Sequence, residues 1–127
     1  MGIFGRSKCQ FLGVGPVLPV PDVEAAVTFY CERLGFTLDF MMGDPPDHGS
    51  VTRDRVGIQF TLAGTQSAGR SYPGWFYCFV EDVDRLAAEF VARQIVFSRP
   101  VTTFDYGMRE FELVDLNGFR LRFGQYV

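Results

Sequence analysis

The clearest alternation of apolar and charged positions lies between Met108 and Phe123. Side chains alternate across a β-strand, so the apolar residues of this stretch fall on one face of two successive strands and the charged residues on the other. The apolar set is Phe111, Leu113, Phe119, Leu121 and Phe123, and the charged set is Glu110, Glu112, Arg120 and Arg122. Asn117-Gly118 between the strands predicts a two-residue type I′ turn, whose central residues both need positive φ. We expect a hairpin whose charged face lines a binding cavity.

Two segments have the apolar spacing of an amphipathic helix. Asp22 predicts an N-cap, Gly35 a stop, and the residues between them an apolar stripe of Val23, Ala26, Val27, Tyr30 and Leu34. Asp82 predicts a second N-cap, followed by a stripe of Val83, Leu86, Ala87, Phe90 and Val91.

Short extended segments surround these helices. Strands are predicted over 36–42, 50–53, 56–62, 75–80 and 95–97, and loops over 44–49 and 100–107. In the first strand Leu38 and Phe40 are expected on one face and Asp39 on the other. Residues 11–20 are apolar but contain Pro16 and Pro19, so they predict an edge strand or one that crosses between subunits.

The same short sequence motif occurs twice, sixty residues apart. Val20-x-Asp22-Val23 and Val80-x-Asp82-Val83 each join a strand to a helix. The chain is therefore interpreted as two copies of strand–helix–strand–strand–strand. This predicts an α+β fold of two βαβββ modules, 11–63 and 74–125, whose curved antiparallel sheets enclose a cleft. The modules form one domain, 11–127, after a flexible arm, 1–10.

The composition limits which ligands and which cellular location we expect. The chain has 127 residues and a net charge of −3, which argues against nucleic acid and leaves cationic ligands open. No apolar run is long enough to cross a membrane, and the first ten residues lack a signal-peptide core. Cys9, Cys31 and Cys78 match no metal or redox spacing. We expect free thiols and a cytoplasmic location.

Three segments together resemble the vicinal oxygen chelate superfamily, which includes glyoxalase I, extradiol dioxygenases, fosfomycin-resistance proteins and bleomycin-resistance proteins. They are 15–40 with Arg33-Leu34-Gly35-Phe36, 51–62 beginning Val51-Thr52-Arg53-Asp54-Arg55-Val56, and 106–118 with Tyr106-Gly107-x-Arg109-Glu110-Phe111 and Asp115-x-Asn117-Gly118. The likeness is greatest to bleomycin-resistance proteins. It implies a homodimer that exchanges its N-terminal strand and has two ligand clefts at the interface.

The resemblance also places the metal ligands of the metal-dependent members. Those four positions fall on Gly15, Gln59, Trp75 and Arg122. Only Gln59 offers an oxygen, and a guanidinium repels a metal ion. We expect no metal and no cofactor.

Candidates for catalysis are few. Glu110 and Glu112 are the best acid–base pair, but the alternative is that they form ion pairs with Arg109, Arg120 or Arg122. Cys78 is expected in the core. His48, in the predicted loop beside Asp44 and Asp47, is expected to be solvated.

The remaining signal is an aromatic cleft. Trp75 and Tyr77 are expected to face it, although an aromatic stripe on an inner strand can also be core. The resemblance places Tyr106 at a stacking position and Asp39 and Phe40 along the groove. The predicted ligand-binding residues are Asp39, Phe40, Gln59, Trp75, Tyr77, Tyr106, Glu110, Glu112 and Arg122.

The sequence therefore predicts a metal-free protein that sequesters a planar, cationic antibiotic or aromatic metabolite without catalysis. The alternatives are a lyase or dioxygenase of the same superfamily, acting through Glu110, Glu112 or a metal, and a protein-interaction module.

Overall fold

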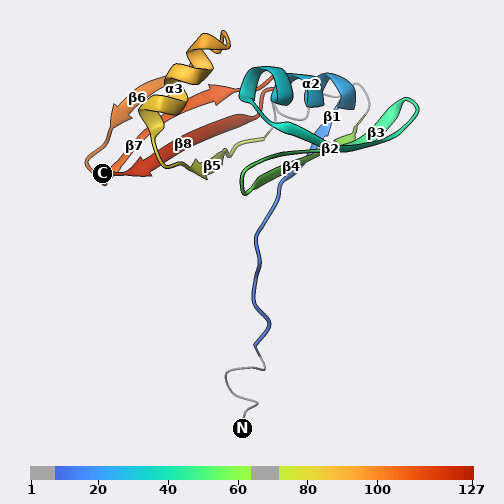
Figure 1. Ribbon diagram of the computed structural model, residues 1–127, viewed down its shortest axis with the longest axis horizontal. Coiled ribbons are helices and arrows are strands. Elements are labelled where there is room, and N and C mark those ends of the chain that lie inside the picture. The colour runs from blue at the N-terminus through green and yellow to red at the C-terminus, as the bar shows by residue number, and fades with distance from the viewer. Residues whose placement is uncertain (1–7, 64–71) are drawn as a thin grey trace.

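The chain folds into two four-stranded sheets, each covered on one face by a helix (Figure 1). The computed structural model describes residues 8–63 and 72–127. The first module has the sheet order β1-β4-β3-β2 and the second β5-β8-β7-β6. The first contains β1 (Val17–Val20), α2 (Val23–Leu34), β2 (Thr37–Gly43), β3 (Pro46–Arg53) and β4 (Val56–Leu62). The second contains β5 (Phe76–Phe79), α3 (Val83–Ala92), β6 (Arg99–Thr103), β7 (Met108–Val114) and β8 (Arg120–Tyr126). The predicted α+β fold of two βαβββ modules is confirmed.

Both helices begin at the aspartates that the sequence marks as N-caps. An Asp22 carboxylate oxygen accepts a hydrogen bond from the Ala25 amide at 3.0 Å, and Asp82 does the same for Arg85 at 3.1 Å. All five residues of the predicted α2 stripe are buried. In α3 the stripe is shorter, because Val91 is exposed and Leu86 only partly buried.

Two predicted loops are wrong. The segment 44–49 turns at Asp44-Pro45, and β3 already begins at Pro46, so His48 is paired with Met42 on one side and Thr61 on the other. The segment 100–107 contains β6, while 95–97 is not a strand. Proline is tolerated in both strands because Pro46 is the first residue of β3 and Pro100 lies on an edge strand, where a missing amide breaks no interior ladder.

A bulge in β2 changes which side chains share a face. Leu38 is opposite Val51, but Phe40 is opposite Ser50, so Asp39 is an extra residue. Directly opposed residues of antiparallel strands share a face. Phe40 therefore lies on the opposite face from Leu38, and the prediction that these two share a face is wrong.

The C-terminal hairpin forms, with a turn one residue longer than predicted. The Asp115 amide donates to the Phe119 carbonyl at 2.8 Å, and the Gly118 amide to the Asp115 carbonyl at 3.2 Å. This closes a three-residue loop in which only Gly118 has positive φ, at 90°, in place of the two-residue type I′ turn. The Asp115 carboxylate also accepts from the amides of Asn117 and Phe119. The predicted apolar face of the hairpin is buried.

The N-terminal residues leave the body of the molecule. Residues 8–16 have no regular secondary structure, and Phe11, Leu12 and Val14 are almost fully exposed. Figure 1 shows this arm leaving on the side opposite the two helices. β1 then pairs in parallel with β4 and is the edge strand that the prolines predict.

Polar contacts join the two modules. The Tyr30 hydroxyl of α2 donates to the Asp115 carboxylate at 2.6 Å, and both residues are buried. Arg33 donates to the carbonyls of Arg93 and Gln94, and Arg93 donates back to the carbonyl of Glu32, so each helix end is bound by an arginine of the other module. Burial and the neighbouring carboxylate raise the pKa of Tyr30 well above its ordinary value, so the phenol remains a donor.

We expect the substitution Tyr30→Phe to destabilise the protein by about 1–3 kcal/mol, because it leaves the buried Asp115 carboxylate without one of its donors. Urea unfolding followed by circular dichroism measures the effect. Tyr126→Phe, at an exposed tyrosine, is the control. Equal stability of the two variants would contradict the role of this contact.

Candidate functional site

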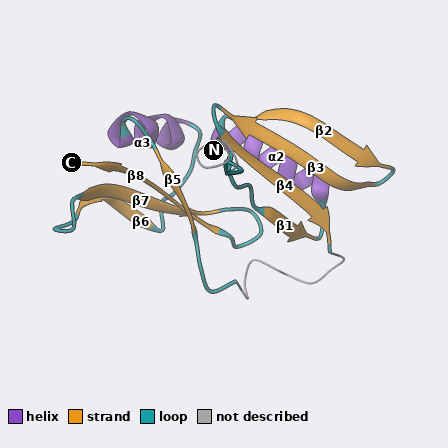
Figure 2. Cartoon of the chain, turned by 90° about the horizontal axis from the view of Figure 1, so that it is seen from below, coloured by secondary structure: helices purple, strands orange, loops and turns teal. Residues whose placement is uncertain are grey.

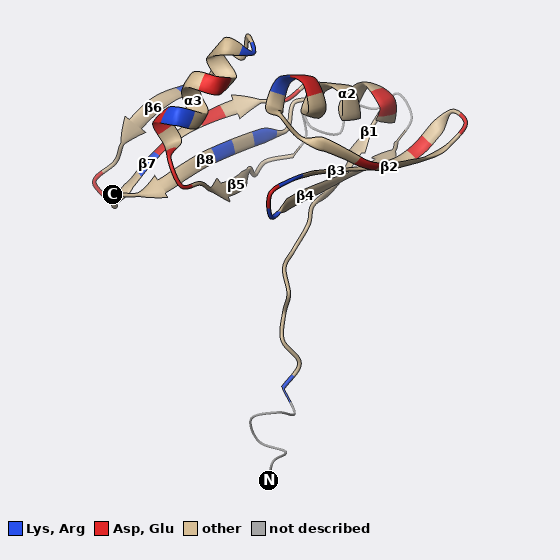
Figure 3. Ribbon diagram, viewed as in Figure 1, with Lys and Arg blue, Asp and Glu red and all other residues tan. Residues whose placement is uncertain are grey.

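The uncovered face of the second sheet gathers most of the predicted ligand-binding residues. Tyr77 is paired with Arg122, Arg122 with Glu112, and Glu110 with Gly124, so these side chains project from neighbouring strands on one face. In Figure 3 the arginines of β8 lie beside the glutamates of β7. The opposite face of the same strands packs against the core with α3.

Glu112 and Arg122 form the ion pair that was the alternative to catalysis. The Arg122 Nε lies 2.7 Å from a Glu112 carboxylate oxygen, and the Ser98 hydroxyl donates to the other oxygen at 2.8 Å. Glu112 is only 4% exposed. Burial by itself raises the pKa of Glu112, but the hydrogen bonds from Arg122 and Ser98 hold it below its ordinary value. This carboxylate is therefore charged and fully engaged.

Glu110 is held by two tyrosines. The hydroxyl of Tyr106 donates to one carboxylate oxygen at 2.7 Å, and the hydroxyl of Tyr77 donates to the other. Burial, followed by the hydrogen bond to Glu110, raises the pKa of Tyr77, and the hydrogen bond raises that of Tyr106. The expected partners Arg109 and Arg120 lie elsewhere, on Asp84 and on the backbone at Pro73 and Gly74.

Trp75 presents an indole to this face. The Arg122 guanidinium carbon lies 3.7 Å from the ring centroid, within cation–π range. The residue is still 44% exposed, so it is not a core residue of the chain. Tyr106 is 60% exposed and stacks on Phe104 with ring centroids 5.1 Å apart.

The uncovered face of the first sheet carries the other predicted residues. The Asp39 carboxylate accepts from the hydroxyls of Ser50 and Thr52, and the Phe40 ring stacks on His48 with centroids 6.0 Å apart. His48 Nε2 lies 2.7 Å from the side-chain oxygen of Gln59. His48 thus belongs to this face, and the prediction of a solvated loop histidine is wrong. The alternation His48, Ser50, Thr52 was the signal that could have found it.

The predicted ligand-binding residues fall into two groups on separate sheets. Asp39, Phe40 and Gln59 lie on the first sheet, and the other six predicted residues belong to the second module. Figure 2, viewed from below, shows β2, β3 and β4 in front of α2, so the uncovered face of the first sheet is turned to the side from which the N-terminal arm leaves.

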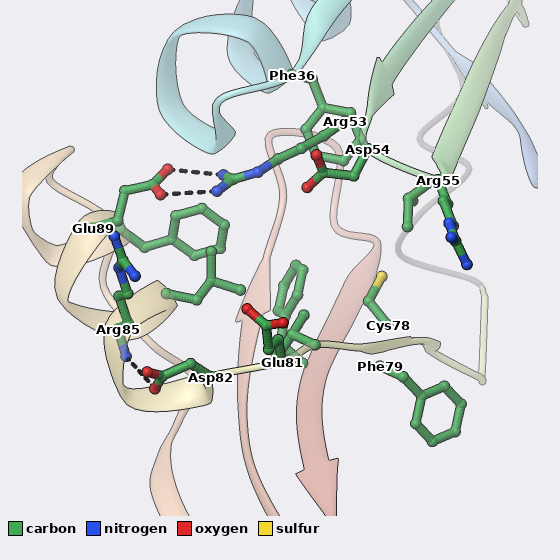
Figure 4. A pocket seen from close by; sticks show the side chains of 15 residues that line it. Phe36, Arg53, Asp54, Arg55, Cys78, Phe79, Glu81, Asp82, Arg85 and Glu89 are labelled. Atoms are coloured by element: carbon green, nitrogen blue, oxygen red, sulfur yellow. Dashed lines mark hydrogen bonds and ion pairs between the residues drawn. The ribbon is translucent and has the colours of Figure 1, made fainter.

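A separate cavity of about 650 Å³ lies between the modules (Figure 4). Its walls come from the β3–β4 turn, β5 and α3, and Arg53 bridges them through two hydrogen bonds to Glu89. None of the nine predicted ligand-binding residues lines it.

Neither Cys31 nor Cys78 is an activated nucleophile. Cys78 packs against the core as predicted, and burial raises its pKa to about 11. Burial also raises the pKa of Cys31. Across residues 8–63 and 72–127, no three His, Cys, Asp or Glu side chains lie close enough to hold a metal ion, and no helix is long and apolar enough to span a bilayer.

Comparison with known proteins identifies the family. Residues 13–123 match the model of the Glyoxalase/Bleomycin resistance protein/Dioxygenase superfamily. The chain belongs to this superfamily. No curated protein matches the sequence significantly.

Solved structures of the superfamily share the fold. A bleomycin-binding protein from bleomycin-producing Streptomyces verticillus, complexed with copper(II)-bleomycin, is 30% identical with a TM-score of 0.74, covering 91% of this chain and 97% of that one. The bleomycin resistance determinant of transposon Tn5 is 22% identical with a TM-score of 0.70, covering 90% and 97%. TioX from Micromonospora sp. ML1 is 20% identical with a TM-score of 0.73, covering 91% and 100%. The predicted resemblance is confirmed.

We expect Glu112→Gln to flatten the acid side of the stability profile. The folded pKa of Glu112 lies below its unfolded value, so the carboxylate stabilises the fold above the unfolded pKa, and this contribution disappears as the pH falls through the folded pKa. Urea unfolding of both proteins between about pH 7 and pH 3 measures the difference, given an unfolded Glu pKa of about 4.3. Other paired carboxylates are common to both proteins and cancel. Parallel profiles would contradict the assignment.

Proposed function

We propose that this member of the superfamily binds and sequesters a planar, cationic small molecule, such as an antibiotic or aromatic metabolite, without metal and without catalysis. The observation that carries the proposal is the set of exposed rings, Phe40, Trp75 and Tyr106, beside charged and hydroxyl groups on the uncovered sheet faces. A protein in excess of its ligand lowers the free ligand concentration by mass action, so sequestration needs no chemical step.

The rings are suited to stacking. Trp75 and Tyr106 lie on the uncovered face of the second sheet, and Phe40, which is 42% exposed, lies on the uncovered face of the first. Stacking of a flat ligand on such a side chain contributes about 1–3 kcal/mol, by analogy with nucleic-acid bases. The carboxylate of Asp39 is exposed and, among the described residues, accepts hydrogen bonds only from hydroxyls, which favours a ligand with positive charge. The Streptomyces verticillus protein, 30% identical to this chain, is complexed with copper(II)-bleomycin.

The residues at the superfamily's metal positions do not suit a metal ion. Gly15 has no side chain and lies beside the Gly57 carbonyl, and Gln59 is bonded to His48. The Trp75 indole has no lone pair that could coordinate a metal ion, and the Arg122 guanidinium places a permanent positive charge over the ring. A metal bound here would meet a cation in its first coordination shell.

An acid–base enzyme is less well supported. Glu112 is occupied by Arg122 and Ser98, and Glu110 by two phenols whose raised pKa values keep them protonated. Neither carboxylate is positioned as an unoccupied base. We therefore place both among the ligand-binding residues rather than assign them a catalytic step.

The complete cleft is proposed to form in a homodimer. The two uncovered faces lie on separate sheets, and among the described residues no hydrogen bond joins a predicted ligand-binding residue of one sheet to one of the other, which supports a cleft completed by a second subunit. Phe11, Leu12 and Val14 are almost fully exposed, which is unfavourable for apolar side chains in water unless a partner covers them. We propose that this arm lies against the partner subunit.

Metal-free bleomycin tests the ligand class through fluorescence, because Trp75 is the single tryptophan. We expect saturable quenching at one ligand per subunit. Tyr106→Ala should weaken binding at least about fivefold, the lower limit for one lost stacking contact. Tyr72→Ala, at a half-exposed tyrosine outside these faces, is the control. Absence of quenching well above micromolar concentrations would exclude bleomycin, and turnover of the ligand would contradict sequestration.

The arm is tested by the double substitution Leu12→Asp and Val14→Asp. Charged residues cannot be buried against a partner without a large desolvation penalty, so we expect the dimer to dissociate in analytical ultracentrifugation. Val96→Asp places one such charge at an exposed valine after α3 and should remain dimeric. A wild-type monomer, or an unchanged dimer in the double variant, would refute the proposed arrangement.

A further inference from the structure

The uncovered face of the second sheet carries arginines that the binding of a cationic ligand does not account for. Three arginines project from the same face as the carboxylates of Glu110 and Glu112. Arg99 and Arg122 lie directly opposite Glu112, one on each neighbouring strand. Arg120 lies opposite Val114, two residues after Glu112 and therefore on the same face. Both carboxylates are 4% exposed and held by donors. The charge that a ligand meets on this face is therefore that of the arginines.

Arg120 is held in place by backbone carbonyls and still has N–H groups that could bind a ligand. One of its terminal nitrogens, Nη2, donates to the Pro73 carbonyl at 2.9 Å and approaches the Gly74 carbonyl at 3.4 Å. Within residues 8–63 and 72–127 its other donors have no partner, and no carboxylate forms a salt bridge with it. An arginine has five N–H donors in a planar fork that matches a carboxylate or phosphate. The backbone contacts thus orient a guanidinium whose remaining donors are free to bind an anion.

The position of Arg120 relative to Trp75 defines the geometry of a ligand. Its guanidinium carbon lies 5.9 Å from the indole centroid, while Arg122 covers the same ring at 3.7 Å. Arg122 forms a salt bridge with Glu112, whereas Arg120 forms none with any described carboxylate and only helps, from farther away, to lower the pKa of Glu112. A ring stacked on the exposed part of Trp75 would carry a substituent at its edge toward Arg120.

We propose that Arg120 and Trp75 form a subsite for an aromatic ring that bears an anionic group, such as a carboxylate, and that the ligand of this protein carries such a group beside its planar system. The inference rests on the proposed function, since it names a further chemical feature of the molecule that the cleft would bind. The inference also implies that the positive charge of the ligand is bound on the first sheet. Among the described residues the carboxylate of Asp39 there accepts only from hydroxyls, so the two faces would bind opposite charges of one ligand.

The test uses two probes that share one ring system, 2-naphthoate and 2-naphthamide, titrated calorimetrically and by Trp75 fluorescence. We expect the anion to bind at least about tenfold more tightly than the amide, as charge-assisted hydrogen bonds to arginine imply. Arg120→Gln should abolish this difference and leave the affinity for the amide unchanged.

Arg85→Gln is the matched control, because Arg85 is an exposed arginine that lines the cavity between the modules. It should leave the preference for naphthoate intact. If Arg85→Gln and not Arg120→Gln removes the preference, the anion binds in the other cavity and the proposal is overturned. Equal binding of both probes overturns the subsite but leaves ring stacking, and so the proposed function, in place. If neither probe binds, the subsite is refuted, and the bleomycin titration decides the proposed function separately.

Discussion

The buried hydrogen bond between Tyr30 and Asp115 is the contact on which the relation between the two modules depends. Asp115 accepts from the Tyr30 hydroxyl and from two amides of its own hairpin loop. One carboxylate therefore shapes the turn of the second module and binds it to the helix of the first. Burial raises the pKa of Asp115, and the three hydrogen bonds act against that rise, so a buried group is kept fully satisfied. The reciprocal contacts of Arg33 and Arg93 complete the junction at the ends of the two helices.

The uncovered faces follow a different rule from the core. The carboxylates there are paired with a neighbour on the adjacent strand, as Glu112 is with Arg122, or accept from hydroxyls, as Asp39 and Glu110 do. Aromatic rings remain exposed among these polar groups. A sheet whose carboxylates are already engaged needs little reorganisation when a flat ligand arrives, and preorganisation of this kind lowers the free-energy cost of binding.

The sequence predicted the parts of the fold that depend on local chemistry. The aspartate caps, the α2 stripe and the alternation of the last hairpin each follow from short-range rules, and the repeat of Val-x-Asp-Val gave the two modules. It failed where tertiary pairing overrides a local signal. Pro46 and Pro100 suggested loops but lie in strands, and the bulge at Asp39 moved Phe40 to the other face. His48 was missed for the same reason, since its partner Gln59 is placed by strand pairing and not by sequence proximity.

The separation of the chain into two sheets has a consequence for how such a protein changes over time. Each module has its own hydrogen-bonded sheet and its own capped helix, and the junction lies on the helix side, away from the uncovered faces. Substitutions on one uncovered face leave the other module's ladder and core untouched, and distant sites contribute almost additively to stability. Descendants of one duplicated unit can thus diversify the two faces independently, so new ligand preferences arise without a new fold.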